Sequence, residues 1–164
     1  MSIKRMLLLW RHGKSAWDNP GLPDMARPLA PRGRRAVPLM AEWLAEHYPP
    51  DRVCCSPARR TLETWSVLAE TLAGEIPVIY DSRIYEADWP DLLTVVQETP
   101  RETGTLLLIG HNPGFEDLTA ALAEQLPRKF STAACAVLRF KGDWAALASG
   151  NASLAAFQWP KALR

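Results

Sequence analysis

Two short apolar runs restrict the fold of this chain more than any other feature of its sequence. Residues 5–10 (RMLLLW) and 105–110 (TLLLIG) are nearly continuous in apolar side chains instead of alternating with polar ones. Such runs are typical of strands that are buried on both faces, as in a parallel sheet between two layers of helices. The first run stops at Arg11-His12 and the second at His111-Asn112. Because such polar side chains are costly to bury, their position directly after buried strands calls for an explanation.

The rest of the chain alternates between helical and extended patterns. Helices are predicted over about 34–48, 57–73, 91–98 and 115–125, and further strands over 52–55, 76–80, 136–140 and 154–158. Pro38 is expected in a first helical turn, and Pro57 at the start of the second helix with Ser56 as its N-cap and Leu62 facing inward. The alternation predicts an α/β fold of three layers, α/β/α, around a mostly parallel central sheet. No linker divides the chain, so residues 1–164 are expected to form one domain.

The composition argues against several classes of partner. The chain has 19 Lys and Arg against 18 Asp and Glu, a formal net charge of +1, so no overall field favours nucleic acid or an anionic membrane. The apolar run before Arg11 is too short for a signal sequence or a membrane span. Three cysteines form neither a disulfide framework nor a metal-ligand pattern, which leads us to expect a reducing, cytoplasmic location.

Polar groups follow three of the predicted strands, and these groups are expected to converge. Arg11-His12 follows the first strand, Ser56 and Arg60 follow the strand over 52–55, and His111-Asn112 follows the strand over 105–110. The carboxyl ends of parallel strands share one edge of a sheet, where ligands bind. Each group alone has a structural explanation, as a satisfied histidine or an arginine that caps carbonyls. Together, two arginines and two histidines would repel one another unless an anion lay between them.

Three segments resemble known motifs, in the right order along nearly the whole chain. LLLWRHGKSAW resembles the RHG signature of the histidine phosphatase superfamily, which is also called phosphoglycerate mutase-like. CCSPARRTLETW is similar to the SPxxRAxQT stretch of that family, with Thr61 for Ala and Glu63 for Gln, and LLLIGHNPGFEDL resembles its second-histidine segment. The short length, RPLAPRG and HNPG are most similar to the SixA-type phosphohistidine phosphatase branch, which lacks the large insertion that covers the site in mutases.

The resemblance implies a phosphoglycerate mutase-like fold and a role for each matched residue. His12 would be the nucleophile that forms a phosphohistidine intermediate. The resemblance places the phosphate clamp at Arg11, Arg60 and His111. Ser15, just after the nucleophile, is expected to approach phosphate through its hydroxyl or its backbone N–H, and Asn112 to orient His111, to contact the substrate or to form a turn. Glu86 lies where many relatives have the acid that protonates the leaving group, although it could equally be an exposed loop carboxylate. No cofactor or metal is expected, since arginine and histidine supply the positive charge that phosphoryl transfer requires.

The implied substrate is a phosphorylated protein, such as a phosphohistidine domain, or a small phosphorylated molecule. A site without a lid favours a protein surface, and Glu86 in contact with the site would favour phosphomonoesters. A mutase would need a phosphoenzyme protected from water, which the missing insertion disfavours. A phosphate-binding module without catalysis is the remaining alternative.

A different phosphatase motif overlaps the second segment. CCSPARRT fits C-x5-R-[ST] from Cys54 to Thr61, the phosphate loop of cysteine-dependent tyrosine phosphatases. Such a loop surrounds phosphate with successive backbone N–H groups, but Pro57 removes one of them. The motif also leaves His12 and His111 without a role. Cys54 is therefore expected to be a small buried strand residue.

Overall fold

The structure is a computed structural model that describes residues 3–125 and 128–164. Six strands form one sheet in the order β3-β2-β4-β1-β5-β6 within this part of the chain. The strands are β1 (Lys4–Arg11), β2 (Arg52–Cys55), β3 (Val78–Tyr80), β4 (Thr105–Gly110), β5 (Cys135–Lys141) and β6 (Ser153–Gln158). The helices are α1 (Pro31–His47), α2 (Arg59–Thr71), α3 (Trp89–Gln97) and α4 (Gly114–Ala123).

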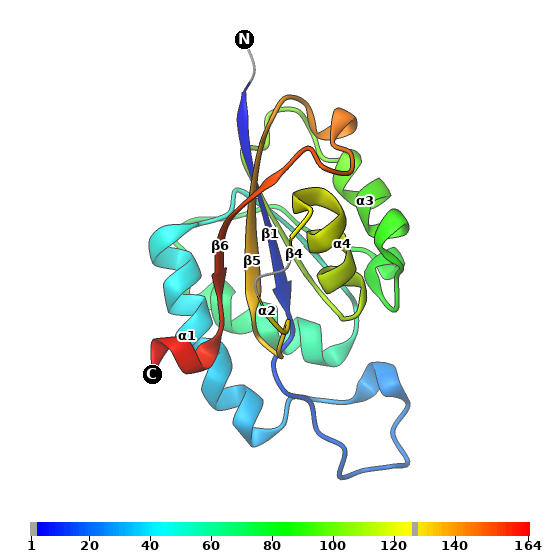
Figure 1. Ribbon diagram of the computed structural model, residues 1–164. Helices are drawn as coiled ribbons and strands as arrows, with labels where there is room; N and C mark the ends of the chain where they lie inside the picture. The colour runs from blue at the N-terminus through cyan, green and yellow to red at the C-terminus, as the bar shows by residue number, and fades with distance from the viewer. Residues whose placement is uncertain (1–2, 126–127) are drawn as a thin grey trace.

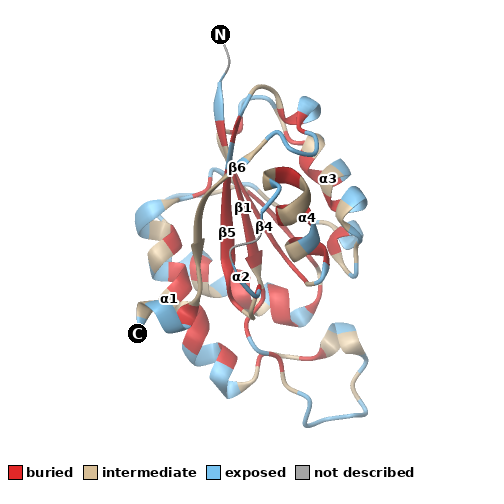
Figure 2. Ribbon diagram, in the orientation of Figure 1, coloured by how far each residue is buried: buried red, intermediate tan, exposed pale blue. Residues whose placement is uncertain are grey.

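The apolar runs are the central strands β1 and β4, which pair in parallel. Side chains of β1 alternate between two cores: Leu7 and Leu9 pack with α3 and α4, whereas Leu8 and Trp10 pack with α1 and α2. Figure 1 shows the sheet between these two pairs of helices, and Figure 2 shows that its middle strands are buried. A strand covered on both faces needs apolar residues at every position, which explains the missing alternation. The predicted three-layer α/β/α fold class is confirmed.

The sheet is mostly parallel, but its last two strands reverse direction. The pairs β1–β4, β2–β4 and β2–β3 are parallel, whereas β5 runs antiparallel to both β1 and β6. Consequently the beginning of β5 and the end of β6 lie at the same edge of the sheet as the carboxyl ends of β1, β2 and β4. The chain between β1 and α1, drawn in blue, extends beyond this edge (Figure 1).

Three details differ from the sequence predictions. Helix α2 begins at Arg59, two residues later than predicted, because the Ser56 hydroxyl accepts from the Ala58 N–H and also contacts a histidine ring (below). Leu62 is exposed, and the buried face of α2 includes Thr61 and Thr64 instead. Pro38 lies inside α1, which begins at Pro31 and buries Val37, Met40, Ala41 and Leu44 against the sheet. This packing offsets the backbone hydrogen bond that a proline cannot donate.

Candidate active site

The register of the central strands brings the two predicted site histidines together. Arg11 pairs with Gly110 at the end of the β1–β4 ladder, and the His12 N–H donates to the Gly110 carbonyl at 3.1 Å. His12 therefore lies beside His111, with ring centroids 5.2 Å apart. On the other side of β4, the Ser56 N–H donates to the Ile109 carbonyl at 3.0 Å, which places Ser56 at the same level. Backbone hydrogen bonds of the sheet thus fix the positions of three predicted groups.

His12 is a buried, neutral imidazole with one nitrogen free. Its Nδ1 lies 2.7 Å from the Gly13 carbonyl oxygen. Because a carbonyl oxygen only accepts, Nδ1 carries the proton and Nε2 keeps its lone pair. Burial lowers the pKa of His12 to about 3, and the positive charges of Arg60 and Arg11 act in the same direction. At neutral pH the ring is therefore unprotonated at Nε2, as a nucleophile requires.

His111 carries its proton on the other nitrogen. Its Nδ1 lies 3.4 Å from Nη2 of Arg60, at the long end of the hydrogen-bonding range, and its Nε2 lies 2.7 Å from the Ser56 hydroxyl. A guanidinium only donates, so Nδ1 accepts and Nε2–H donates to Ser56. Burial and the charge of Arg60 lower the pKa of His111 to about 3. An anion bound beside this ring would favour its protonated form and make it a second donor.

Two guanidinium groups complete the cluster, and each has a donor that is unsatisfied. Arg60 is 5% exposed, and Arg11 donates through Nη1 to the Phe130 carbonyl at 2.8 Å. Among the described residues, Nε of Arg11 and Nε of Arg60 have no hydrogen-bond partner although both are buried. Unpaired buried donors are rare in proteins, and here they lie in a cluster of positive charge. The arrangement suits a tetrahedral oxyanion with several acceptor oxygens.

Asp24 holds Arg60 in place, which the sequence analysis missed. Nη2 of Arg60 lies 3.0 Å from Oδ2 of Asp24, and Nη1 donates to the Asp24 carbonyl at 2.9 Å. The Tyr85 hydroxyl donates to the same carboxylate, and this bond, together with contacts to Arg27 and Arg60, lowers the pKa of Asp24 to about 2. The Tyr85 ring packs edge-on against His111, with centroids 5.4 Å apart. The one available signal was an acidic residue within the long segment between β1 and α1, which contains Pro20, Pro23 and Pro28.

Ser15 and Asn112 are placed by contacts with the protein. The Ser15 hydroxyl accepts from Nη1 of Arg27 at 2.7 Å. The Asn112 amide donates to the Phe130 carbonyl at 3.0 Å and its oxygen accepts from the Glu116 N–H at 3.2 Å. Both side chains therefore hold the loops that surround the histidine pair.

Glu86 is placed differently from the other predicted site residues. Its side chain is exposed and makes no hydrogen bond or ion pair with any other described residue. Burial and the contact with Asp24 are the main causes that raise the pKa of Tyr85 to about 12, and the charge of Glu86 adds a smaller effect in the same direction. Since Tyr85 packs against His111, Glu86 lies next to the outer wall of the cluster. The structure does not bring it into contact with His12, Arg11, Arg60 or His111.

Cys54, the nucleophile of the alternative motif, lies inside the sheet. It belongs to β2 and faces the core formed with α3 and α4. Burial raises the pKa of its thiol, which keeps the sulfur protonated and weakly nucleophilic at neutral pH.

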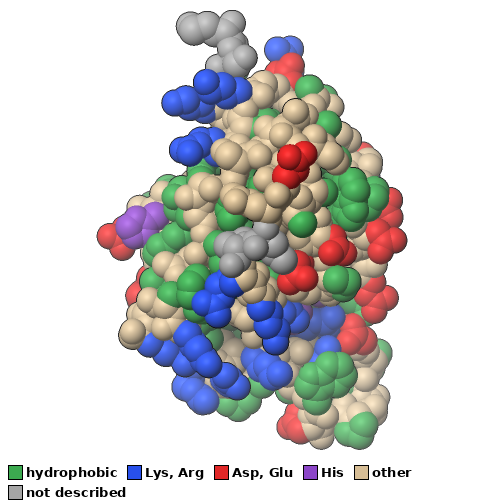
Figure 3. All heavy atoms as spheres, viewed as in Figure 1, with side chains coloured by type: hydrophobic (Ala, Val, Ile, Leu, Met, Phe, Trp, Pro, Cys, Tyr) green, Lys and Arg blue, Asp and Glu red, His purple; other side chains and the backbone are tan. Residues whose placement is uncertain are grey.

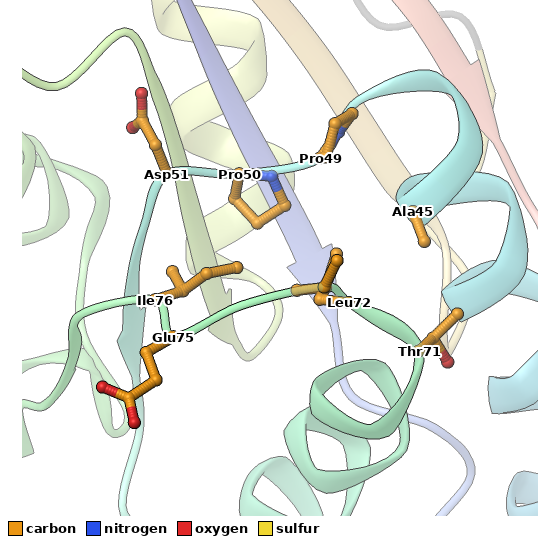
Figure 4. A pocket seen from close by; sticks show the side chains of 9 residues that line it. Ala45, Pro49, Pro50, Asp51, Thr71, Leu72, Glu75 and Ile76 are labelled. Carbon is orange, nitrogen blue, oxygen red and sulfur yellow. The ribbon is translucent and has the colours of Figure 1, made fainter.

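A pocket also lies at the opposite edge of the sheet, but the side chains that line it are of a different kind. This cavity of about 480 Å³ lies where the chain enters β2, and Figure 4 shows proline and aliphatic side chains around it, with Asp51 and Glu75 as its charged residues. The Asp51 carboxylate accepts from the backbone N–H groups of Gly104 and Thr105. Over residues 3–125 and 128–164, no group of three or more His, Cys, Asp or Glu is arranged to hold a metal ion. None of the helices in the same ranges has the length and apolar character to span a membrane.

Sequence comparisons with known proteins identify a family and a relative of this chain. Residues 7–107 match the family described as histidine phosphatase superfamily (branch 1). An uncharacterized protein of Mycobacterium tuberculosis is 37% identical over 162 residues, which cover 92% of this chain and 99% of the relative.

Two solved structures are similar over nearly their whole length. A putative phosphohistidine phosphatase SixA from Nakamurella multipartitia has a TM-score of 0.85 and 30% identity, over 96% of each chain. A putative phosphohistidine phosphatase SixA from Agrobacterium tumefaciens has a TM-score of 0.82 and 28% identity, over 95% of this chain and 98% of the other. The protein therefore belongs to branch 1 of the histidine phosphatase superfamily and is a phosphatase.

Proposed function

We propose that this protein is a phosphohistidine phosphatase that acts on a phosphorylated protein, with His12 as the nucleophile. The observation that carries the proposal is the buried His12 ring, which keeps Nε2 free, lies beside the His111 ring and is close enough to Arg60 and Arg11 for their charges to lower its pKa. The similarity to two SixA proteins over the full length of the chain supports the substrate class. The three cysteines are free and buried, which supports a reducing compartment, and we place the reaction in the cytoplasm.

The first step transfers the phosphoryl group to His12. Nε2 attacks phosphorus, the bond between phosphorus and the substrate imidazole breaks, and the leaving imidazole takes a proton from solvent. The developing charge on the phosphoryl oxygens is met by the guanidiniums of Arg11 and Arg60 and by His111. The Gly13 carbonyl stabilises the phosphorylated ring, since it accepts from Nδ1–H, where positive charge increases.

The second step is hydrolysis. Water attacks phosphorus, the bond to Nε2 breaks with its electron pair returning to Nε2, and a proton of the water passes to solvent. The same cationic groups neutralise the inorganic phosphate until it dissociates. Ser15 and Asn112 assist indirectly, because their side chains hold the loops that carry the phosphate-binding groups.

The exposed position of Glu86 bears on the substrate. An ester leaves as an alkoxide, which depends on a positioned acid for roughly 10²–10⁴-fold in rate. An imidazole leaving group depends on such an acid much less. A carboxylate that makes no fixed contact with the cluster therefore favours a phosphorus–nitrogen substrate. The alternative, a phosphomonoesterase for a small phosphorylated metabolite, is supported by the position of Glu86 beside Tyr85.

The proposal is tested with a panel of substrates and two variants. Wild-type protein, His12→Ala and Glu86→Gln are assayed on a phosphohistidine protein, phosphoramidate, sugar phosphates and an aryl phosphate. We expect His12→Ala to lose all turnover and to lose the acid-labile phosphate that wild-type protein carries after mixing with substrate. Glu86→Gln should keep phosphohistidine turnover, as should the control Glu70→Gln on the exposed face of α2.

Two outcomes would contradict the proposal. Efficient turnover of sugar phosphates that Glu86→Gln abolishes, with slow phosphohistidine turnover, would identify a phosphomonoesterase. Tight binding of phosphate without turnover of any substrate and without labelling of His12 would identify a binding module.

A further inference from the structure

A second pocket adjoins the phosphoryl site and is lined by cations. This pocket, about 500 Å³ in volume, includes Arg11, which also belongs to the histidine cluster. Its other charged lining residues are Lys14, Arg32, Arg128, Lys129, Lys161 and Arg164. Of the described residues, no Asp or Glu lines it. We refer to it below as the basic pocket.

The reversal of β5 and β6 explains why these cations gather. Arg11 and Lys14 follow the end of β1, and Arg32 lies in the first turn of α1. Arg128 and Lys129 precede β5, while Lys161 follows β6. Strand β5 is antiparallel to β1, and β6 is antiparallel to β5. The segments that carry these cations therefore meet at one edge of the sheet. Figure 3 shows Lys and Arg side chains gathered over this end of the molecule, with Asp and Glu mainly on the other side of the view.

The charges of the basic pocket are not neutralised within the described chain. None of its seven cations forms an ion pair with a described carboxylate, whereas six of the other twelve Lys and Arg do: Arg5, Arg27, Arg59, Arg60, Arg83 and Arg101. Helix α1 has no acidic residue in its first turn, where the helix dipole favours one, and Arg32 lies there instead. Such a concentration of charge in a protein of net charge +1 favours a ligand with several negative charges.

The shape of the basic pocket favours a small molecule over a protein surface. Its volume lies in the range of ligand pockets, roughly 300–1,000 Å³. One wall is the Trp159 ring, with the Arg128 guanidinium 3.9 Å from the ring centroid. Guanidinium and ammonium groups at different sides of a concavity suit adjacent phosphate groups, which present acceptor oxygens in several directions.

We propose that the basic pocket is a binding site for a small polyanion with adjacent phosphate groups, such as a diphosphate or triphosphate. This site goes beyond the proposed turnover of phosphohistidine. Arg11 joins the two sites, so one phosphate of the ligand lies next to the phosphoryl position while the others contact Arg128 and Lys161.

The experiment measures binding of inorganic tripolyphosphate and orthophosphate by calorimetry. It uses His12→Ala protein, which prevents turnover, at an ionic strength of about 0.15 M, where the Debye length is about 8 Å. Tripolyphosphate should bind at least about tenfold more tightly than orthophosphate. Adding Arg128→Ala and Lys161→Ala should weaken tripolyphosphate binding about tenfold, because two charge-assisted contacts are lost.

The matched control removes the same charge elsewhere. Arg139→Ala with Lys141→Ala changes two exposed cations at the far end of β5 and should leave tripolyphosphate binding within about twofold. Equal binding of both anions, or equal weakening by both pairs of substitutions, would overturn the proposal and leave a solvated basic surface.

A third result would also overturn it. If Arg128→Ala with Lys161→Ala raises KM for a phosphorylated protein but leaves tripolyphosphate binding unchanged, the cations contact an acidic protein surface. Failure of wild-type protein to hydrolyse phosphohistidine would refute the proposed function alone, because the binding measurement does not depend on turnover.

Discussion

His12 and His111 are the same kind of side chain, yet their surroundings give them opposite tautomers. The Gly13 carbonyl holds the proton of His12 on Nδ1, and the Arg60 guanidinium leaves the proton of His111 on Nε2. In the proposed mechanism, one ring offers a lone pair to phosphorus, and the other offers a nitrogen that becomes a donor when an anion raises its pKa. A difference in two hydrogen bonds separates the proposed nucleophile, His12, from the proposed phosphate-binding group, His111.

Asp24 is expected to act on turnover through Arg60. Asp24→Asn keeps the shape of the side chain but removes the charge that orients the guanidinium, so we expect kcat/KM to fall about tenfold or more. The main effect should be on kcat, because Arg60 meets the charge that develops during transfer. Steady-state kinetics check this, with Asp18→Asn in the same loop as the control. A Tm that falls while kcat is unchanged would show that Asp24 only stabilises the fold.

Cys54 tests the alternative mechanism. Cys54→Ser should leave turnover within about twofold and lower the free energy of unfolding by about 1 kcal/mol, because a buried hydroxyl replaces a thiol. Activity assays and urea unfolding measure the two effects. Complete loss of activity in a folded variant would require a thiolate nucleophile.

At the scale of elements, the strands were predictable and the contacts between loops were not. The β1 and β4 segments were clear because strands buried on both faces require continuous apolar runs. The convergence of His12, Arg11, Arg60 and His111 followed from the carboxyl ends of β1, β2 and β4, and their expected roles followed from the resemblance to histidine phosphatases. Asp24, Tyr85 and Arg27 could not be found, because their partners are distant in sequence and are set by how loops pack. The start of α2 was misplaced for a similar reason: His111 engages the hydroxyl that was expected to cap the helix.

The junction between β1 and α1 depends on close backbone packing. A Cβ at Gly33 would lie 2.3 Å from the Lys14 carbonyl oxygen, so the backbone two residues after His12 would have to move. We expect Gly33→Ala to cost about 1–3 kcal/mol of folding free energy and to reduce kcat/KM as well. Urea unfolding and kinetics test this, with Gly21→Ala as the control, where the nearest atom lies 3.4 Å away. Unchanged stability of Gly33→Ala would contradict the packing argument.

At the scale of the whole molecule, the site makes stability depend on pH. The pKa values of His12 and His111 are about 3 in the folded protein and about 6.5 in an unfolded chain. Between these values the unfolded state binds more protons, so stability falls as the pH is lowered from 6.5 toward 3. Asp24, with its lowered pKa, adds to the loss only below its unfolded value of about 4.

At pH 5 we expect a loss of about 2 kcal/mol for each of the two histidines relative to pH 7. Urea unfolding of wild-type protein and of His12→Gln with His111→Gln at both pH values measures it. The double variant should show a much smaller loss. Equal losses in the two proteins would mean that other groups control the acid sensitivity.

The chain from Lys14 to Ala30 closes on itself at its base, where the Ala30 N–H donates to the Lys14 carbonyl and the Ala16 N–H to the Pro28 carbonyl. The Asp24 carboxylate accepts from Arg60 of α2 and so attaches this loop to the rest of the protein, whereas Arg27 donates to Ser15 within the loop itself. Of the residues between these contacts, the exposed Trp17 stacks on Arg27 within the same loop. Segments that recognise other substrates could therefore replace the loop residues that lie between these contacts. The sheet would still hold the His12 and His111 rings beside each other.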